Sequence, residues 1–201
     1  MKQSSISRKN TLVMKFGGTS VGTVEAMLQV ADIVKDARQE WQQVAVVSSA
    51  MAGVTNFLLA LVDTAINGNR DQIISAIDDL RARHYGVIEH IELPDQRKNK
   101  VMQSVEEILM ELQETCKAIN ILSEASPRSW DAVASTGERL AVRVLSAVME
   151  SREINCCYID SSRIIVTDDE FQNAAPDLSA TQLKADEIIQ PMFTKQCTPI
   201  I

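Results

Sequence analysis

Residues 12–22 constrain the fold of this 201-residue chain more than any other stretch. They read Leu-Val-Met-Lys-Phe-Gly-Gly-Thr-Ser-Val-Gly, an apolar run that ends on Lys15-Phe16 and is followed by Gly17-Gly18. The pattern predicts a buried strand, a tight glycine turn and the start of a helix. A lysine cation and unhindered backbone N–H groups would then meet at the carboxyl edge of a sheet, where a helix N-terminus also points. The stretch therefore predicts a site for an anion, above all for a phosphate group.

A helix and a second strand extend this unit. Residues 24–34 carry apolar side chains at helical spacing, with Thr23 as the expected N-cap. Residues 44–47 (Val-Ala-Val-Val) then form a strand that is apolar on both faces, as in a parallel sheet covered by helices. Strand, helix and strand at this spacing predict a βαβ unit with a right-handed crossover.

The rest of the chain adds helices and short strands. Two long helical patterns within residues 67–122 are expected to form an antiparallel pair inserted into the α/β core. Further helices are predicted from about residue 56, from residue 135 and over residues 180–193, and further strands over residues 154–159, 163–167 and 198–201. These elements predict an α/β fold: a three-layer αβα sandwich with a mainly parallel sheet and a helical insertion.

Composition and charge argue against several classes of protein. A net charge of −7 disfavours a nucleic-acid partner, so an anionic ligand needs a local cation such as Lys15. No apolar run approaches the ~20 residues of a membrane helix, and residues 1–10 read as a polar, flexible tail without the features of a secretory signal. The four cysteines show no CxxC spacing, which favours free thiols in a reducing cytoplasm. The two histidines lie six residues apart on a predicted helix, so we assign no metal site to them.

Two further motifs carry candidate site residues, and each has a structural alternative. Residues 48–56 (Ser-Ser-Ala-Met-Ala-Gly-Val-Thr-Asn) follow the second strand, so their hydroxyl groups are expected at the same sheet edge. The alternative is that Thr55 or Asn56 caps a helix. Ser135-Thr136-Gly137-Glu138 matches a capping box, in which the glutamate returns to the N-cap N–H, and Glu138 could instead face the cleft and pair with a ligand ammonium. Arg139 could be a cation of the cleft, although a solvated helix residue is the favoured interpretation. Residues 15–18 taken alone fit a surface turn equally well.

Taken together and in this order, the three motifs resemble aspartate kinases of the amino-acid kinase superfamily. The resemblance rests on Lys-Phe-Gly-Gly-Thr-Ser after the first strand, Val-Val-Ser-Ser-Ala-Met-Ala-Gly-Val-Thr-Asn after the second, and Ser-Thr-Gly-Glu-Arg-Leu at residues 135–140. It spans residues 11–201, and the helical insertion resembles that of the longer members of the family. It implies the carbamate kinase-like sandwich and ATP-dependent phosphorylation of the side-chain carboxylate of L-aspartate with Mg²⁺, the first step of lysine, threonine and methionine biosynthesis.

The resemblance also implies roles for individual residues. Lys15 would stabilise the transferred phosphoryl group, and Gly17 and Gly18 would donate backbone N–H groups to the phosphates of ATP. Ser49 and Thr55 would hold the aspartate, and Glu138 would accept from its α-ammonium group. Phe16 and Ser20 complete the expected nucleotide-binding loop, and no residue is assigned to a metal.

The carboxyl end of the chain departs from the family pattern. The family continues after a strand like Thr-Pro-Ile-Ile into a second substrate motif, an adenine-binding lobe and regulatory ACT domains. We therefore expect residues 11–201 to be the aspartate-binding, N-terminal part of a catalytic domain that has little activity alone, and we expect the full-length protein to be a homo-oligomer. Aspartyl phosphate formation by the chain, measured as the hydroxamate, would contradict that expectation.

Two alternatives stay open at this stage. One is another kinase of the superfamily, with glutamate, N-acetylglutamate or uridine monophosphate as acceptor. The other is a non-catalytic protein that pairs with a full-length kinase and regulates it.

Overall fold

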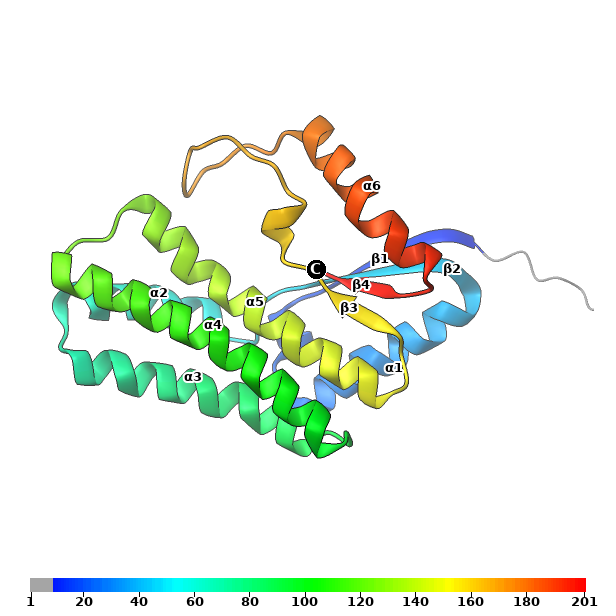
Figure 1. Ribbon diagram of the computed structural model, residues 1–201, viewed down its shortest axis with the longest axis horizontal. Helices are drawn as coiled ribbons and strands as arrows, with labels where there is room; N and C mark the ends of the chain where they lie inside the picture. The colour runs from blue at the N-terminus through cyan, green and yellow to red at the C-terminus, as the bar shows by residue number, and fades with distance from the viewer. Residues whose placement is uncertain (1–8) are drawn as a thin grey trace, which may run out of the picture.

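The computed structural model describes residues 9–201, which form a parallel sheet flanked by helices (Figure 1). The strands are β1 (Lys9–Phe16), β2 (Trp41–Ser48), β3 (Cys156–Tyr158) and β4 (Thr198–Ile200). The helices are α1 (Val24–Glu40), α2 (Val54–Asn67), α3 (Arg70–His90), α4 (Asp95–Leu122), α5 (Pro127–Ser151) and α6 (Leu178–Thr194), with short 3₁₀ helices η1 (Gly18–Val21) and η2 (Ser161–Arg163). Strand β1 begins inside the stretch expected as a tail, whose residues 1–8 lie outside the described residues.

The sheet explains the layered arrangement of the helices. Its strand order is β1-β2-β4-β3, and every pairing is parallel. The step from β1 to β2 and the step from β3 to β4 run in opposite directions across the sheet. Because both crossovers are expected to be right-handed, α1 and α6 must lie on opposite faces. Figure 1 shows this arrangement, with α6 on one side of the strands and α1 and α5 on the other. The predicted α/β sandwich with a parallel sheet is confirmed.

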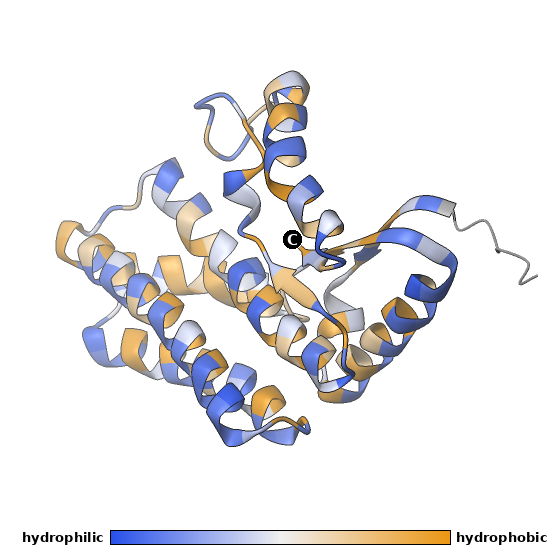
Figure 2. Cartoon of the chain, turned by 45° about the vertical axis from the view of Figure 1, so that its right-hand side comes forward, coloured by the Kyte–Doolittle hydropathy of each residue, from blue (hydrophilic) through white to orange (hydrophobic). Residues whose placement is uncertain are grey.

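Helices α2 to α5 form a bundle beside the sheet. Helix α3 runs antiparallel to α4 and packs against it, as predicted for the inserted pair (Figure 1). These helices carry one hydrophobic and one hydrophilic face (Figure 2). The buried residues of α4 recur at helical spacing: Val105, Ile108, Leu109, Leu112, Cys116 and Ile119. No helix among residues 9–201 is long and apolar enough to cross a membrane.

The predicted start of α5 at Ser135 is wrong. The helix begins at Pro127, and Ser126 is its N-cap, with the side chain accepting from the backbone N–H of Ser129 at 3.2 Å. Ser135 lies mid-helix, where its hydroxyl donates to the carbonyl of Ala132 at 3.0 Å. The capping box that residues 135 and 138 suggested is therefore absent, and Glu138 projects from the middle of a long helix.

Two further local predictions need correction, whereas others hold. Neither Thr55 nor Asn56 caps α2, because Gly53 occupies the N-cap position with a φ of 77°, a backbone conformation that favours glycine. Residues 163–167 form no strand; the chain runs from η2 into a loop with one isolated bridge, between Thr167 and Pro176. The N-cap at Thr23 is confirmed, and so is the last strand, as β4.

Candidate active site

The carboxyl edge of the sheet gathers segments that lie far apart in the sequence. Phe16 pairs with Ser48 at the ends of β1 and β2, and Tyr158 pairs with Ile200 at the ends of β3 and β4. The connection from β1 to β2 crosses the sheet in one direction and the connection from β3 to β4 crosses it in the other, so the strand order reverses between β2 and β4. Such a reversal opens a crevice at the carboxyl ends of the strands. Side chains from the loops at this edge are therefore the first candidates for a ligand site.

The loop after β1 holds a cation over a glycine turn. Lys15 is exposed, and a Cβ built on Gly17 would lie 4.0 Å from its Nζ atom, so the ammonium group lies close to the turn. The turn is closed by a hydrogen bond from the N–H of Ser20 to the carbonyl of Gly17 at 2.9 Å. Helix α1 starts directly afterwards, with the Thr23 hydroxyl accepting from the N–H of Ala26 at 3.2 Å. A lysine, a glycine backbone and a helix N-terminus together favour an anion.

The loop after β2 packs directly on the first loop. The N–H of Ser49 donates to the carbonyl of Phe16 at 3.1 Å. A Cβ on Gly18 would lie only 2.9 Å from the carbonyl oxygen of Ala50, closer than real Cβ atoms approach. Any side chain at position 18 would therefore push the two loops apart.

The second loop leads into the N-terminus of α2. Gly53 turns the chain, and the Thr55 side chain is exposed in the first turn of the helix. Arg83 of α3 donates to the carbonyl of Ala52 at 3.3 Å, which ties this loop to the helical bundle. A hydroxyl group thus lies where the positive end of a helix dipole also favours negative charge.

Helix α5 brings Glu138 against the second loop. Its Oε1 atom accepts from the N–H of Ala50 at 3.4 Å, a long hydrogen bond. The approach depends on Gly137, which is buried and whose Cβ would lie 2.8 Å from that of Ala50. The carboxylate is half-buried, so one side remains available to a ligand.

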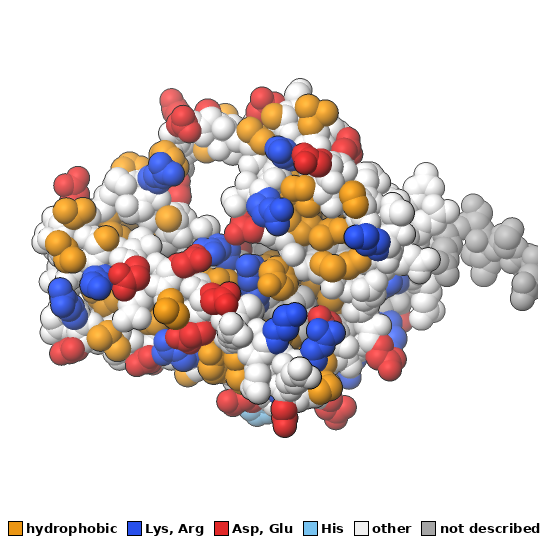
Figure 3. Space-filling view, viewed as in Figure 1, with side chains coloured by type: hydrophobic (Ala, Val, Ile, Leu, Met, Phe, Trp, Pro, Cys, Tyr) orange, Lys and Arg blue, Asp and Glu red, His pale blue; other side chains and the backbone are white. Residues whose placement is uncertain are grey.

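Glu138 also lines a cavity of about 440 Å³ at this edge. Its polar wall includes Ser135 and Arg139 from α5, and Asp160, Ser161 and Ser162 from the segment after β3. Nearby, the space-filling view shows a hollow between the N-terminal end of α5 and the loop that links η2 to α6 (Figure 3). That loop reaches α5 through the N–H of Gln172, which donates to Asp131 at 2.7 Å.

Charged pairs fix the cavity wall. Arg139 pairs with Asp160 at 3.3 Å and with Glu111 of α4 at 2.7 Å, so it is a bridging residue and the prediction of a solvated arginine is wrong. Burial acts to raise the pKa of the Asp160 carboxyl, but hydrogen bonds from Ser162 and the charges of Arg139 and Arg143 outweigh burial. The pKa of Asp160 therefore lies below its usual value, and the group is ionised at neutral pH.

Two contacts connect the segments that carry the predicted site residues. The loop that carries Lys15, Phe16, Gly17, Gly18 and Ser20 contacts the loop that begins with Ser49, and that loop contacts Glu138. Of these predicted residues only Glu138 is among the described residues that line the 440 Å³ cavity, so Lys15 and Thr55 lie outside its wall.

Sequence reasoning missed Arg83 and the wall at residues 160–162. A usable signal existed for the wall, because Asp160-Ser161-Ser162 follows a strand in the same way as the two predicted loops. Within residues 9–201 no three His, Cys, Asp or Glu side chains cluster in a way that could hold a metal ion.

The chain is similar to known proteins in both sequence and structure. Residues 10–196 match the family described as "Amino acid kinase family". Lysine-sensitive aspartokinase 3 of Escherichia coli is 31% identical over 175 residues, which cover 84% of this chain and 35% of that protein. Two crystal structures of E. coli aspartokinase III, one with lysine and aspartate and one with aspartate and ADP, superpose with a TM-score of 0.80 at 25% identity. Each superposition covers 96% of this chain and 40% of the other, so the chain spans well under half the length of these relatives.

Proposed function

This chain belongs to the amino acid kinase family, and on that premise we propose that its carboxyl-edge site serves phosphoryl transfer from ATP to the side-chain carboxylate of L-aspartate. The observation that carries the proposal is the contact of the three motifs. The N–H of Ser49 donates to Phe16, and the N–H of Ala50 donates to Glu138. An anion-binding loop, a hydroxyl-bearing loop and a carboxylate are thereby held as one unit.

The first loop suits the phosphates of ATP. Lys15 supplies a mobile positive charge over the turn, where it can follow the negative charge of a phosphoryl group in transfer. We assign the backbone N–H groups of Gly17 and Gly18 to the phosphate oxygens, and Phe16 and Ser20, on either side of the glycine pair, to the same loop. Mg²⁺ would arrive as part of MgATP, held chiefly by phosphate oxygens, because magnesium prefers such sites to cages of protein ligands.

The second loop and α5 suit the acceptor. We assign Ser49 and Thr55 to the carboxylates of L-aspartate, as neutral donors beside the N-terminus of α2. We assign Glu138 to the α-ammonium group, since within the described part of the chain its half-buried carboxylate accepts one long hydrogen bond, from the N–H of Ala50. No covalent bond between protein and substrate is needed, and rate enhancement comes from positioning and charge stabilisation.

Binding of each ligand tests the proposal directly. L-Aspartate should raise the thermal unfolding midpoint of the chain, whereas L-glutamate and uridine monophosphate should not. Glu138→Gln should abolish the shift, because a neutral amide loses the charge-assisted hydrogen bond to an ammonium group, worth about 1.5–3 kcal/mol. Glu150→Gln, on the same helix but facing a different surface depression, is the matched control and should keep the shift.

Other outcomes would redirect the assignment. A shift with L-glutamate or uridine monophosphate in place of L-aspartate would assign the site to a different acceptor of the family. A response to L-aspartate that survives Glu138→Gln would contradict the proposed geometry. Hydroxamate formation with ATP and L-aspartate, measured in parallel, reports whether the bound ligands also react.

A further inference from the structure

Two cysteine thiols lie side by side near the amino edge of the sheet, opposite the candidate active site. Cys157 lies in β3 and Cys197 directly precedes β4, its neighbouring parallel strand. Their Sγ atoms are 2.7 Å apart, although 40 positions separate them in the chain. A disulfide holds its sulfurs about 2.05 Å apart, so only a small movement of the side chains would join them.

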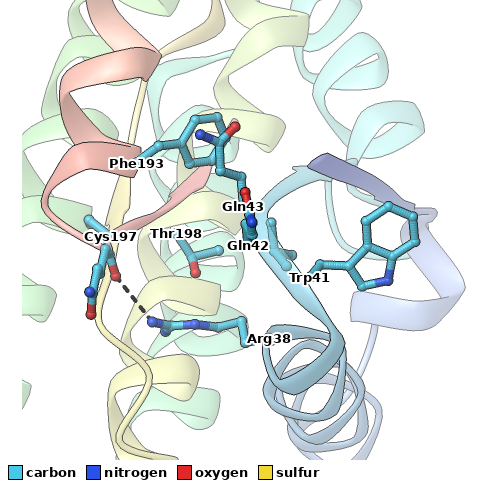
Figure 4. Close-up of a pocket in the computed structure, with 9 residues that line it drawn as sticks. Arg38, Trp41, Gln42, Gln43, Phe193, Cys197 and Thr198 are labelled. Atoms are coloured by element: carbon cyan, nitrogen blue, oxygen red, sulfur yellow. Dashed lines mark hydrogen bonds between the residues drawn. The ribbon is translucent and has the colours of Figure 1, made fainter. Parts of the chain in front are cut away.

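The two thiols differ in exposure. Cys157 is exposed, whereas Cys197 is buried and lines a cavity of about 220 Å³ at the amino edge of the sheet (Figure 4). Burial, with a hydrogen bond to Cys157, raises the pKa of the Cys197 thiol to about 12. An oxidant from solution therefore reacts first with the exposed thiol of Cys157, and the neighbouring thiol of Cys197 is the resolving group.

Arg38 holds the two cysteine segments in place. Its guanidinium donates to the carbonyl of Gln196 at 3.1 Å, drawn as the dashed line in Figure 4. It also donates to the carbonyl of Asn155 at 3.3 Å. The Asn155 side chain also donates to the carbonyl of Gln196 at 3.3 Å. The backbone within two residues of each cysteine is thus tied to the other segment, so the thiols stay together without a covalent bond.

We propose that Cys157 and Cys197 form a reversible disulfide when the protein meets a hydroperoxide. The Cys157 thiol ionises, its thiolate sulfur attacks a peroxide oxygen, and the O–O bond breaks to leave a sulfenic acid. For hydrogen peroxide the leaving group is hydroxide, which takes the proton that the thiol released and becomes one water. The Cys197 sulfur then attacks the sulfenic sulfur and displaces hydroxide, which takes the thiol proton and leaves as a second water. Two thiols are oxidised and one peroxide is reduced, and a dithiol such as dithiothreitol reverses the change.

The bond would constrain the wall of the candidate active site. The segment between the two cysteines contains Asp160, Ser161 and Ser162, which line the 440 Å³ cavity, and the whole of α6. A cross-link between the start and end of that segment limits how far it can open. Formation of this disulfide does not depend on the proposed kinase activity.

Titration of thiols after oxidation tests the proposal. The reduced protein has four free cysteines. Limiting hydrogen peroxide should leave two thiols in the unfolded, alkylated protein and lower its mass by two hydrogen atoms. Trypsin cleaves after Arg152, Arg163 and Lys195. Digestion should therefore release one disulfide-linked pair of peptides, in which residues 153–163 are joined to the peptide that contains Cys197. Oxidised protein should unfold at a higher temperature than reduced protein.

Cys156 provides the matched control. It neighbours Cys157 but lies on the opposite side of the strand, where its thiol contacts the carbonyl of Ser146 at 3.5 Å. Cys156→Ser should still form the cross-link, whereas Cys157→Ser and Cys197→Ser should each lose it together with the rise in unfolding temperature. A cross-link that survives Cys157→Ser, or wild-type protein that gains oxygen at Cys157 and forms no disulfide, would overturn the proposal. Because Cys157 is exposed, its serine variant should fold, and circular dichroism checks this.

Discussion

The two edges of the same sheet differ in their electrostatic character. At the carboxyl edge, α1 and α2 begin, and their free N–H groups favour negative charge. At the amino edge, α1 and α6 end, and carbonyl groups gather there. Arg38 is a cation in that place, and it donates to two carbonyl groups. Both edges have a cavity. Among residues 9–201, however, only the carboxyl edge combines a lysine, glycine turns and a carboxylate without an ion-pair partner, Glu138, that could accept from a ligand ammonium group.

This difference follows from strand direction. In a parallel sheet every strand ends at one edge, so every following helix starts there and every preceding helix finishes at the other. The carboxyl edge therefore favours an anion such as the phosphate that we propose, whereas the amino edge is better suited to holding chain segments together. Variants that affect one edge and spare the other test this division.

Loss of the lysine charge should have the largest effect. Lys15→Met removes the cation from the carboxyl edge, so affinity for MgATP should fall about 10- to 100-fold, the equivalent of one charged hydrogen bond. Isothermal titration calorimetry measures the change. Lys35→Met, an exposed lysine of α1, is the control and should leave affinity unchanged. Equal losses in both variants would mean that general charge, and not the loop, attracts the nucleotide.

A methyl group at Gly137 should push α5 away from the loop after β2, at the same carboxyl edge. Gly137→Ala places a Cβ 2.8 Å from that of Ala50, so it should destabilise the fold by about 1–3 kcal/mol in urea unfolding and weaken L-aspartate binding. Gly86→Ala is the matched control, because it is also in a helix interior but has open space around its Cβ. That variant should gain stability, by up to about 1 kcal/mol. A neutral result at Gly137 would show that α5 need not approach the loop closely.

Removal of the arginine should affect only the amino edge. Arg38→Met leaves two carbonyl groups without their charged donor, so we expect a loss of about 1 kcal/mol in the free energy of unfolding. Ligand-induced shifts at the carboxyl edge should stay the same as in the wild type. A variant that loses L-aspartate binding while it keeps its fold would show that the two edges are coupled.

The acid in the cavity wall should give a smaller, pH-dependent effect. The folded-state pKa of Asp160 is depressed, so its contribution to stability is present above the unfolded value of about 4 and is lost as pH falls through the folded value. Asp160→Asn should therefore cost about 0.5–1 kcal/mol at pH 7, and the difference from wild type should shrink below pH of about 4. Asp36→Asn, at an exposed position of α1, is the control and should leave the stability at pH 7 close to that of the wild type. Unfolding curves across pH provide the measurement.

Local sequence patterns correctly predicted those helices, strands and turns that depend on residues close together in the chain. The strand and glycine turn at residues 12–18, the Thr23 cap and the inserted helix pair all follow from spacing within one turn or strand. The same logic failed at Ser135, because Ser-x-x-Glu also occurs inside a helix; the Ser126-Pro127 pair was the better start signal. Residues 163–167 (Arg-Ile-Ile-Val-Thr) are rich in β-branched side chains, which favour strands, but no described strand pairs with them.

The assembly of the site could be predicted only in part. The first two loops could be predicted to lie together, because each follows one of two neighbouring parallel strands and such strands end at the same edge of the sheet. The reach of Glu138 to the N–H of Ala50 depends on the packing of α5, and Gly137 alone does not reveal it. The Arg139–Asp160 pair and the Cys157–Cys197 contact join residues that only the final strand order brings together.

Hydrogen–deuterium exchange with and without ligands tests the central claim most directly, because one experiment reports on both edges. With L-aspartate and MgATP, the amides of residues 17–22 and 49–56 and those around Glu138 should exchange more slowly. The amides of residues 41–44 and 196–198, at the amino edge, should be unchanged. Protection confined to the amino edge, or no protection at residues 17–22 and 49–56 under conditions where the ligands bind, would contradict the account.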